Sequence, residues 1–189
     1  MTENEIIRTV KSRLSEKRFR HTQGCVDMAE RLSERWGADV ALARRAAWLH
    51  DVAKELPYEK QLEIVKDSGD SLTLIQKSQK IIHAFSGAIL ARDEFLECED
   101  VCSAIRWHTT ARSGMSKLEK VIWLADLTEE GRSFNGVEEI RKLAFSDISR
   151  ALVLGFDTTL RVLLENGNQI DTNMIEARNS EVACAVWED

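Results

Sequence analysis

Six side chains in this sequence have the chemistry of metal ligands. They are four histidines and two aspartates, namely His21, His50, His83, His108, Asp51 and Asp126. His50 and Asp51 are adjacent and close an apolar run that begins at Val40. Neighbours on a helix point about 100° apart, so both side chains can flank one cation, and the second oxygen of Asp51 could bridge to another. The set predicts a two-metal centre for metal-assisted hydrolysis, with iron, manganese, zinc or nickel as suitable ions.

The same histidines have a plainer interpretation. A lone histidine on an apolar helix face is usually a hydrogen-bonded core residue, and this explanation fits any one of the four. Their joint pattern favours metal binding, because three of them fall at expected helix ends, His83 opens a helix, and Asp126 ends the apolar run 121–125. Buried carboxylates rarely lack a partner. Short histidine patterns also arise by chance, so composition and spacing leave both interpretations open.

Helices are expected almost throughout the chain, because it has one proline and few runs of β-branched residues. The predicted fold class is all-α, with no sheet. Thr2-x-x-Glu5 and Ser116-x-x-Glu119 are capping-box patterns that predict the starts of the first helix and of the helix carrying Asp126. Gly37 is the expected end of a second helix. The helices are expected to begin near residues 3, 21, 39, 57, 83, 100, 116, 137, 147 and 172.

The expected connections bring cations near the histidines. Lys54 falls in the short connection that follows His50 and Asp51, and Arg112 falls in a loop, 109–116, that follows His108. The stretch 70–79 is expected to be a loop or a short helix at the border of a substrate cleft. The polar stretch 131–136 is expected to connect two helices, although such a loop could also close over a ligand.

Composition predicts a single domain over residues 1–189, since a chain of this length buries enough surface for a stable core. No apolar run reaches the ~18 residues of a membrane span, and the acidic amino terminus is unlike a secretory signal. A cytoplasmic location is therefore expected. The four cysteines, which form no Cys-x-x-Cys pair, are expected to be ordinary reduced thiols.

The net charge of −6 disfavours a partner that is polymeric nucleic acid, which would require clustered lysine and arginine. A small phosphate compound is the better expectation, because metals and a few local cations can hold it within a negative envelope. Arg18, Arg20, Lys54 and Arg112 could supply those cations. They could equally be solvated surface charges, the usual role of such residues.

The chain resembles the HD-domain metal-dependent phosphohydrolases, and within them it is similar to the YqeK-type bis(5'-nucleosyl)-tetraphosphatases of bacteria. The resemblance keeps order and spacing over nearly the whole chain. The matching segments are Arg18–Thr22, Ala47–Lys54, Ala104–Arg112, Met115–Lys120, Ala125–Asp126, Glu130–Arg132, Phe134–Val137 and Ile175–Asn179.

The resemblance implies a compact helical bundle that holds two divalent metal ions and cleaves diadenosine tetraphosphate into two ADP. Iron is the implied metal, with manganese, zinc or magnesium as alternatives. His21, His50, Asp51 and Asp126 match one metal site, His83 and His108 match the second, and Asp51 matches the bridging position. Residues implied to contact the dinucleoside polyphosphate or nucleoside diphosphate are Arg18, Lys54, Thr109, Arg112, Arg132 and Arg178. Among these, Lys54 and Arg112 join Asp51 as the implied catalytic residues.

Ala84 and Phe85 depart from the family pattern, because they follow His83 where the family usually has Gly-Pro. None of the departures removes a metal ligand, so they bear on substrate preference and rate. Two rival functions stay open: an HD-type nucleotidase or cyclic-nucleotide phosphodiesterase, and a metal-stabilised nucleotide-binding module without turnover. A homodimer through apolar surface of the last helices is also possible.

Overall fold

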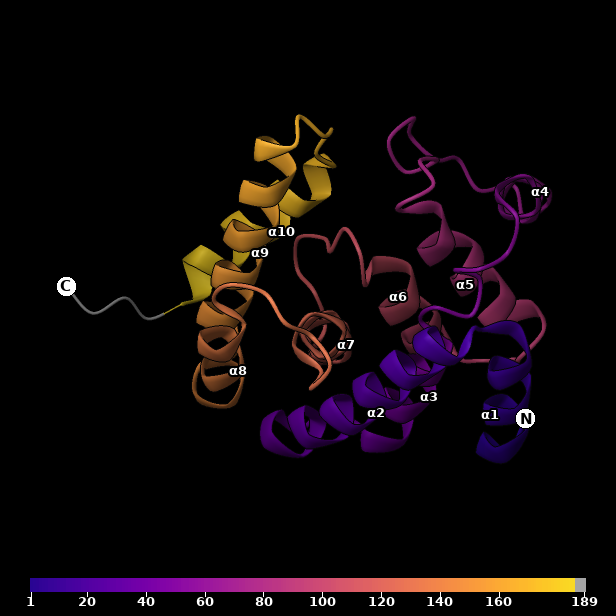
Figure 1. Cartoon of the computed structure of the whole chain (residues 1–189), viewed down its shortest axis with the longest axis horizontal. Helices are drawn as coiled ribbons and strands as arrows, with labels where there is room; N and C mark the ends of the chain where they lie inside the picture. Colours follow the sequence, from indigo (N-terminus) through magenta and orange to yellow (C-terminus); the bar gives the residue numbers. More distant parts are fainter. Residues whose placement is uncertain (186–189) are drawn as a thin grey trace.

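Residues 1–185, the described part of the chain, form ten helices. The structure is a computed structural model that describes residues 1–185, so the last four residues of the predicted domain lie outside the described part. The described residues contain no strand, as the all-α prediction requires. The helices are α1 (Glu3–Arg13), α2 (Glu16–Trp36), α3 (Val40–Leu49), α4 (Tyr58–Asp67), α5 (Ile82–Asp93), α6 (Glu99–Trp107), α7 (Lys117–Thr128), α8 (Val137–Ser146), α9 (Ile148–Glu165) and α10 (Thr172–Cys184) (Figure 1).

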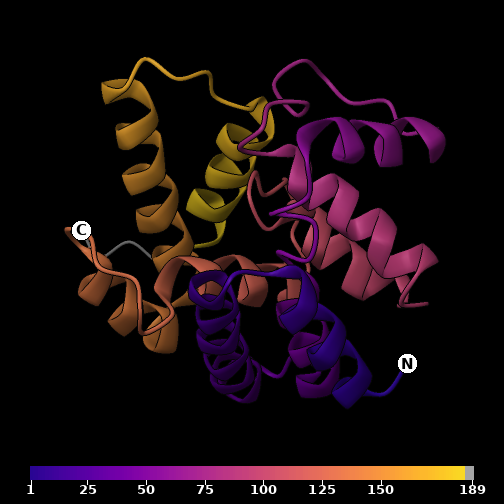
Figure 2. The ribbon, with the colours of Figure 1, turned by 45° about the vertical axis from the view of Figure 1, so that its right-hand side comes forward.

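The helices pack in a way that surrounds α7. The long helix α2 packs along α3 and α7, α6 packs against α3, α5 and α7, and α9 packs against α7, α8 and α10. Figure 2 shows α4 and α5 on one side of the molecule and α9 and α10 on the other, with α1, α2 and α3 beneath them. The elements that carry the predicted ligands, α2, α3, α5, α6 and α7, are therefore neighbours in space.

Two hydrophobic cores hold this arrangement. The main core includes Leu32, Leu49 and Leu124, which are fully buried and belong to α2, α3 and α7. A smaller second core is formed by Val65, Leu72, Ile82, Phe85 and Ile89, which join α4 and α5 to the loop between them. Burial of this apolar surface supplies the main stabilisation of the fold.

The capping predictions are confirmed at both boxes. The hydroxyls of Thr2 and Ser116 accept from the backbone N–H three residues on, and the glutamates at those positions, Glu5 and Glu119, accept from the backbone N–H groups of the caps. Gly37 ends α2 in the left-handed conformation at φ 66°, which glycine adopts at little cost.

The predicted start of α2 at about residue 21 is wrong. The helix begins at Glu16, because the Ser15 hydroxyl accepts from the Arg18 N–H and acts as the N-cap. Position 18 is an arginine, so no capping box is present. Instead the Glu55 carboxylate accepts from the backbone N–H and the hydroxyl of Ser15. His21 therefore lies in the second turn of α2, where it is fixed by a continuous helix rather than by a helix end.

The stretch 70–79 forms turns and contains no helix. It lies beside the loop between α9 and α10, because Lys80 Nζ is 3.3 Å from Asn168 Oδ1 and Thr73, Leu74 and Ile75 share a cavity with Gln169 and Ile170. In the described part of the chain, no helix has the length and apolar character that a membrane crossing requires.

Candidate metal centre

Asp51 is the centre of the cluster of predicted ligands. It is 3% exposed and lies in the turn that follows α3. Its Oδ2 atom is 3.5 Å from His50 Nε2 and 3.9 Å from His21 Nε2. Its Oδ1 atom is 3.3 Å from His83 Nε2 and 3.8 Å from His108 Nε2. The two carboxylate oxygens thus face two different pairs of histidines, which is the arrangement that a bridging carboxylate needs.

Helix ends orient two of the imidazoles. His50 and His108 are the C-caps of α3 and α6, and their Nδ1 atoms lie 2.7 Å from the Ala47 oxygen and 2.6 Å from the Ile105 oxygen. A carbonyl only accepts, so each Nδ1 is the donor, and in the neutral imidazole each Nε2 keeps a free lone pair. The last carbonyls of a helix lack the usual N–H partner four residues further on, so they can accept a hydrogen bond from a side chain. The local fold therefore sets the tautomer in which Nε2 can bind a metal.

The cluster fits divalent metal ions. The His50 Nε2 atom is fully buried and makes no hydrogen bond with any residue in the range 1–185, although buried polar atoms normally have partners. Donor atoms of His50, Asp51 and His108 lie within 4.8 Å of one another, as do donor atoms of His21, His50 and Asp126. We refer to His21, His50 and Asp126 as the first half of the centre and to His83 and His108 as the second half. Asp51 lies between them.

The second half consists of neutral imidazoles. Burial, and then the nearby His83 and His50, lower the pKa of His108 to about 3. Burial also lowers the pKa of His83, and its neighbour Lys54 contributes in the same direction. Neutral imidazole is the form that coordinates metal ions.

The first half has the opposite electrostatics. Burial by itself lowers the pKa of His21, but hydrogen bonds to Asp126 and Cys25 outweigh it and raise the pKa to about 10. Burial likewise opposes the ionisation of Asp126, yet its bond to His21 and the charge of Arg132 hold its pKa well below the usual range. The first half is therefore a negative environment that attracts positive charge, from protons or from a metal ion.

Glu129 is a residue of this centre that the sequence analysis missed. It is 5% exposed, and its Oε1 atom is 3.1 Å from His21 Nδ1. A carboxylate at Nδ1 leaves Nε2 of His21 directed at Asp126, 3.0 Å away. Two glycines make room for Glu129, because an added Cβ would lie 2.5 Å from its Oε2 at Gly24 and 2.9 Å from it at Gly131. In the sequence Glu129 is one of two consecutive glutamates after a helix, a pattern that gives no sign of burial.

Arg141, on α8, fixes the loop that carries Glu129. Its guanidinium donates to the backbone oxygens of Thr128 at 2.8 Å, Glu129 at 2.7 Å and Arg132 at 2.8 Å. Because charge-assisted bonds to three carbonyls leave the loop little freedom, Arg141 positions both Glu129 and Arg132 beside the first half.

Three of the predicted cations lie at the centre. Arg18 NH1 is 2.9 Å from Asp51 Oδ2, and Arg132 forms an ion pair with Asp126. Lys54 Nζ is 3.2 Å from the ring nitrogens of His83. Burial lowers the pKa of Lys54, with Arg18 and Arg132 acting in the same direction and Asp51 and Asp126 opposing it.

The other predicted substrate contacts are placed differently. Arg112 Nε is 2.9 Å from Glu119 Oε1 on α7, and Arg178 pairs with Asp157 on α9. Thr109 directly follows His108, and its buried hydroxyl has no hydrogen-bond partner among the described residues. The structure thus groups Arg18, Lys54 and Arg132 with the metal ligands and gives the two remaining arginines carboxylate partners outside the cluster.

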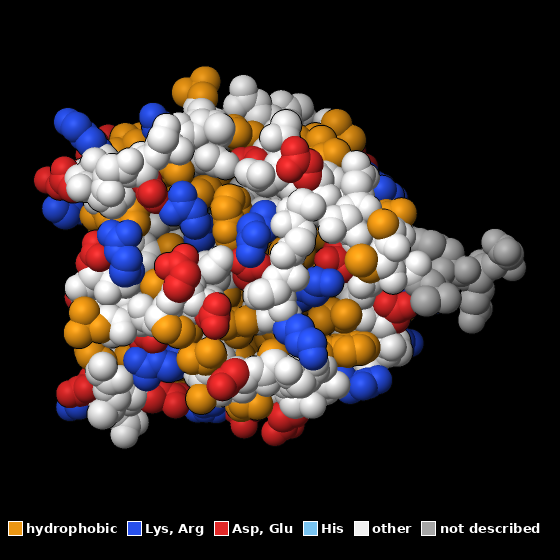
Figure 3. All heavy atoms as spheres, turned by 180° about the vertical axis from the view of Figure 1, so that it is seen from behind, with side chains coloured by type: hydrophobic (Ala, Val, Ile, Leu, Met, Phe, Trp, Pro, Cys, Tyr) orange, Lys and Arg blue, Asp and Glu red, His pale blue; other side chains and the backbone are white. Residues whose placement is uncertain are grey.

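A cavity of about 770 Å³ adjoins the first half of the centre. Its lining includes His21 and Glu129 together with the cations Lys17, Arg18, Arg20 and Arg132. This volume lies within the range of small-molecule binding sites. On the face seen in Figure 3, basic and acidic side chains are interspersed, as they are in the lining of this cavity.

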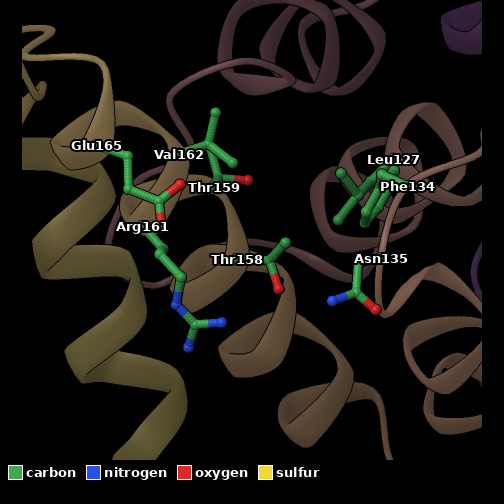
Figure 4. A pocket seen from close by; sticks show the side chains of 8 residues that line it. All are labelled: Leu127, Phe134, Asn135, Thr158, Thr159, Arg161, Val162 and Glu165. Atoms are coloured by element: carbon green, nitrogen blue, oxygen red, sulfur yellow. The ribbon is translucent and has the colours of Figure 1, made fainter.

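A second cavity, of about 360 Å³, has no predicted ligand in its lining. Figure 4 shows Leu127, Phe134 and Asn135 on one side of it and side chains of α9, among them Arg161 and Glu165, on the other. Of these two cavities, only the cavity of about 770 Å³ is lined by a predicted metal ligand, His21.

The ligand cluster lies within a known type of domain. The family model described as HD domain matches residues 18–131, which is more than half of the chain and includes all six predicted ligands. The chain belongs to the HD domain family. His50 and Asp51 are the adjacent histidine and aspartate of this HD domain.

Relatives narrow the family further. The chain is 39% identical to a symmetrical bis(5'-nucleosyl)-tetraphosphatase of Bacillus subtilis (strain 168), over 90% of this chain and 92% of that protein. It is 34% identical to the protein of the same name from Halalkalibacterium halodurans, over 95% of this chain and 96% of that protein. The predicted resemblance to this group of HD-domain proteins is confirmed.

A solved structure supports the fold of this HD domain. It is a crystal structure of a predicted HD superfamily hydrolase involved in NAD metabolism from Clostridium acetobutylicum. The two chains superpose with a TM-score of 0.94 at 38% identity, covering 98% of this chain and 99% of the other.

Proposed function

We propose that this protein is a phosphohydrolase that cleaves dinucleoside tetraphosphates symmetrically, so that diadenosine tetraphosphate and water give two ADP. One observation carries the proposal. The two oxygens of Asp51 face two pairs of histidines, in a chain matched almost end to end by proteins named for this reaction. In the reaction a phosphoric anhydride bond breaks, and the oxygen of water joins one of the two phosphorus atoms.

We propose that the centre holds two divalent metal ions, with iron as the first choice and manganese, zinc or magnesium as alternatives. His21, His50 and Asp126 would hold one ion, His83 and His108 would hold the other, and Asp51 would contact both. Ions bound in this way lower the pKa of water and neutralise negative charge on a polyphosphate.

The cations of the protein act on the substrate phosphates in this proposal. Lys54 is half-buried beside His83, so its charge is only partly screened by solvent. Arg18 and Arg132 lie on the wall of the large cavity. Together they stabilise the charge that gathers on phosphoryl oxygens in the transition state, and removal of one such donor commonly costs about 3 to 4 kcal/mol. Thr109, Arg112 and Arg178 complete the set of proposed substrate contacts.

The remaining parts of the proposal concern the setting of the enzyme. Residues 1–189 would form one HD domain located in the cytoplasm, and the partner would be a small nucleotide, since basic side chains form no continuous stripe on the face in Figure 3. A homodimer would use apolar side chains exposed on α9 and α10, among which Leu164 is 67% and Ile175 is 41% exposed.

The direct experiment is turnover of diadenosine tetraphosphate by protein reconstituted separately with iron(II), manganese and zinc, with the nucleotide products resolved. ADP as the only product, formed at a rate that chelation abolishes, supports the proposal. Products other than ADP would contradict symmetric cleavage.

A substrate panel separates the rival functions in the same assay. Faster turnover of a nucleoside monophosphate or of a cyclic nucleotide would replace the proposal by a nucleotidase or a cyclic-nucleotide phosphodiesterase. Stoichiometric metal and tight nucleotide binding without any turnover would replace it by a binding module.

A further inference from the structure

Cys25 lies directly beside the first half of the metal centre. It is on α2, four residues after His21, so the two side chains share one helix face. Cys25 is 1% exposed, and its Sγ atom is 3.5 Å from His21 Nε2. This is the nitrogen that also lies 3.0 Å from Asp126 Oδ1. The thiol therefore lies beside the position where the metal ion of the first half is expected.

His50 provides independent evidence that this position takes a ligand. Donor atoms of His21, Cys25, His50 and Asp126 all lie within 4.8 Å of one another. Among them, His50 Nε2 is fully buried and has no hydrogen-bond partner in residues 1–185. The four donor atoms come from α2, the end of α3 and α7, and they lie close enough together to bind one ion.

The spacing agrees with coordination of one ion by both atoms. Bonds of about 2.3 Å to sulfur and about 2.0–2.1 Å to imidazole nitrogen place these two atoms about 3.5 Å apart when the angle between the two bonds is close to tetrahedral. The distance from Cys25 Sγ to His21 Nε2 is 3.5 Å. A simple thiol–imidazole hydrogen bond would have a similar length, so the experiment must distinguish direct coordination from that bond.

We propose that Cys25 is a further ligand of the ion in the first half, so that His21, His50, Asp126 and Cys25 join the shared Asp51 and supply this ion with two nitrogens, two carboxylate oxygens and one sulfur. This proposal rests on the metal centre of the proposed function. On coordination the thiol loses its proton to solvent and binds as thiolate. A thiolate favours ions such as zinc, cobalt(II) and iron over magnesium and manganese. Cys25 would therefore set which metals the first half accepts.

Cobalt(II) tests the proposal without a turnover assay. In the full-length protein loaded with cobalt(II), thiolate coordination produces a near-ultraviolet sulfur-to-cobalt charge-transfer band. We expect this band in the wild-type protein and expect Cys25→Ser to abolish it while cobalt still binds. We also expect Cys25→Ser to reduce the preference for zinc over manganese in direct competition.

Cys102 offers a matched control. It is also a buried cysteine, but its Sγ lies 3.7 Å from the Glu97 backbone oxygen and its side chain belongs to the main core. Cys102→Ser is expected to keep the charge-transfer band and the metal preference. A variant with serine at positions 98, 102 and 184, which keeps Cys25 as its one cysteine, is expected to keep the band as well.

X-ray absorption of the zinc-loaded wild-type protein avoids reliance on any variant that folds poorly. A sulfur neighbour at about 2.3 Å from zinc is expected. If the metal binds stoichiometrically but cobalt gives no charge-transfer band and zinc has no sulfur neighbour, Cys25 is not a ligand, and the proposed metal centre still stands. Failure of any divalent ion to bind would overturn both.

Discussion

The first and second halves of the metal centre share Asp51, but they differ in the protein that surrounds them. In the first half, His21 is held by Glu129 and Asp126 by Arg132. In the second half, Nε2 of His83 and Nε2 of His108 lie 3.2 Å apart, and the positive Lys54 lies beside His83. The first half thus has its own carboxylate, whereas the second half has only the shared carboxylate of Asp51.

The two halves also rest on different cores. The first half is carried by α2, α3 and α7, which pack together around the main core. His83 lies on α5, whose residues Ile82, Phe85 and Ile89 belong to the smaller second core. Phe85 occupies one of the positions where the chain departs from the family pattern, and it is buried against Trp107, with ring centroids 6.0 Å apart. Phe85 therefore helps to fill the second core, and α5 runs unbroken from Ile82 to Asp93.

This difference indicates a division of roles. Ordered partners and negative charge should make the first half the tighter metal site. Neutral ligands and a neighbouring lysine should make the second half the weaker site, with room for water and phosphate oxygens.

Asp51→Asn should affect both halves together. The amide keeps the shape of the side chain but loses the charge that faces all four histidines, so turnover should fall by about 10³-fold or more. Metal analysis should show less than the wild-type content, and the helical circular dichroism should be unchanged. Normal turnover by this variant would refute the bridging role of Asp51.

His108→Ala should separate the two halves. We expect it to lose the second ion and to keep the first, so that metal content falls by one equivalent and turnover falls by about 10²-fold. The comparison variant is His21→Ala, which should lose the tighter ion. If metal titrations of the two variants give equal losses of affinity, the two halves do not differ as proposed.

Glu129→Ala should weaken the first half selectively. Removal of a carboxylate that orients a ligand histidine typically costs 10- to 100-fold in metal affinity. The affinity of the first half for its metal ion should therefore fall by about that factor. Glu130→Ala is the control, because Glu130 is 73% exposed and pairs with Arg31. Isothermal titration calorimetry measures the metal affinity of both variants. Equal affinities in the two variants would show that Glu129 has no positioning role.

Lys54→Met should lower kcat more than Arg112→Met. Lys54 is half-buried beside the second half, and its loss should cost about 3 kcal/mol, or roughly 10²-fold. Arg112 is 39% exposed and already paired with Glu119, so its removal should cost about tenfold or less. Steady-state kinetics with diadenosine tetraphosphate gives the kcat of both variants for this comparison. Equal losses would mean that Arg112 leaves Glu119 when the substrate binds.

Arg178→Ala should have the smallest effect of the proposed contacts. Its pair with Asp157 is partly exposed, and such pairs contribute about 0 to 1 kcal/mol, so KM should change by no more than about fivefold. Asp157→Asn, which frees Arg178, is the companion variant. A tenfold or larger rise in KM for Arg178→Ala would make it a major phosphate contact.

Local features of the fold could be predicted from sequence because they depend on residues a few positions apart. The capping boxes at Thr2 and Ser116 and the stop at Gly37 each involve neighbours in the chain, and each prediction is confirmed. The start of α2 was predicted wrongly, because its Ser15 cap lacks the glutamate at position 18 that would complete a capping box, and Glu55, 40 residues away, takes that place. A pattern of adjacent residues contains no information about that partner.

The same distinction applies to the metal centre. The sequence by itself predicted the six candidate ligands, because the chemistry of histidine and aspartate is a property of the residue and the family resemblance covers all six positions. Only the tertiary structure decided that the two oxygens of Asp51 face different histidine pairs, that Cys25 lies beside the first half, and that Glu129 supports His21 from 108 residues away. These relations depend on distance and direction between atoms, and the packing of α2 against α3 and α7 determines both.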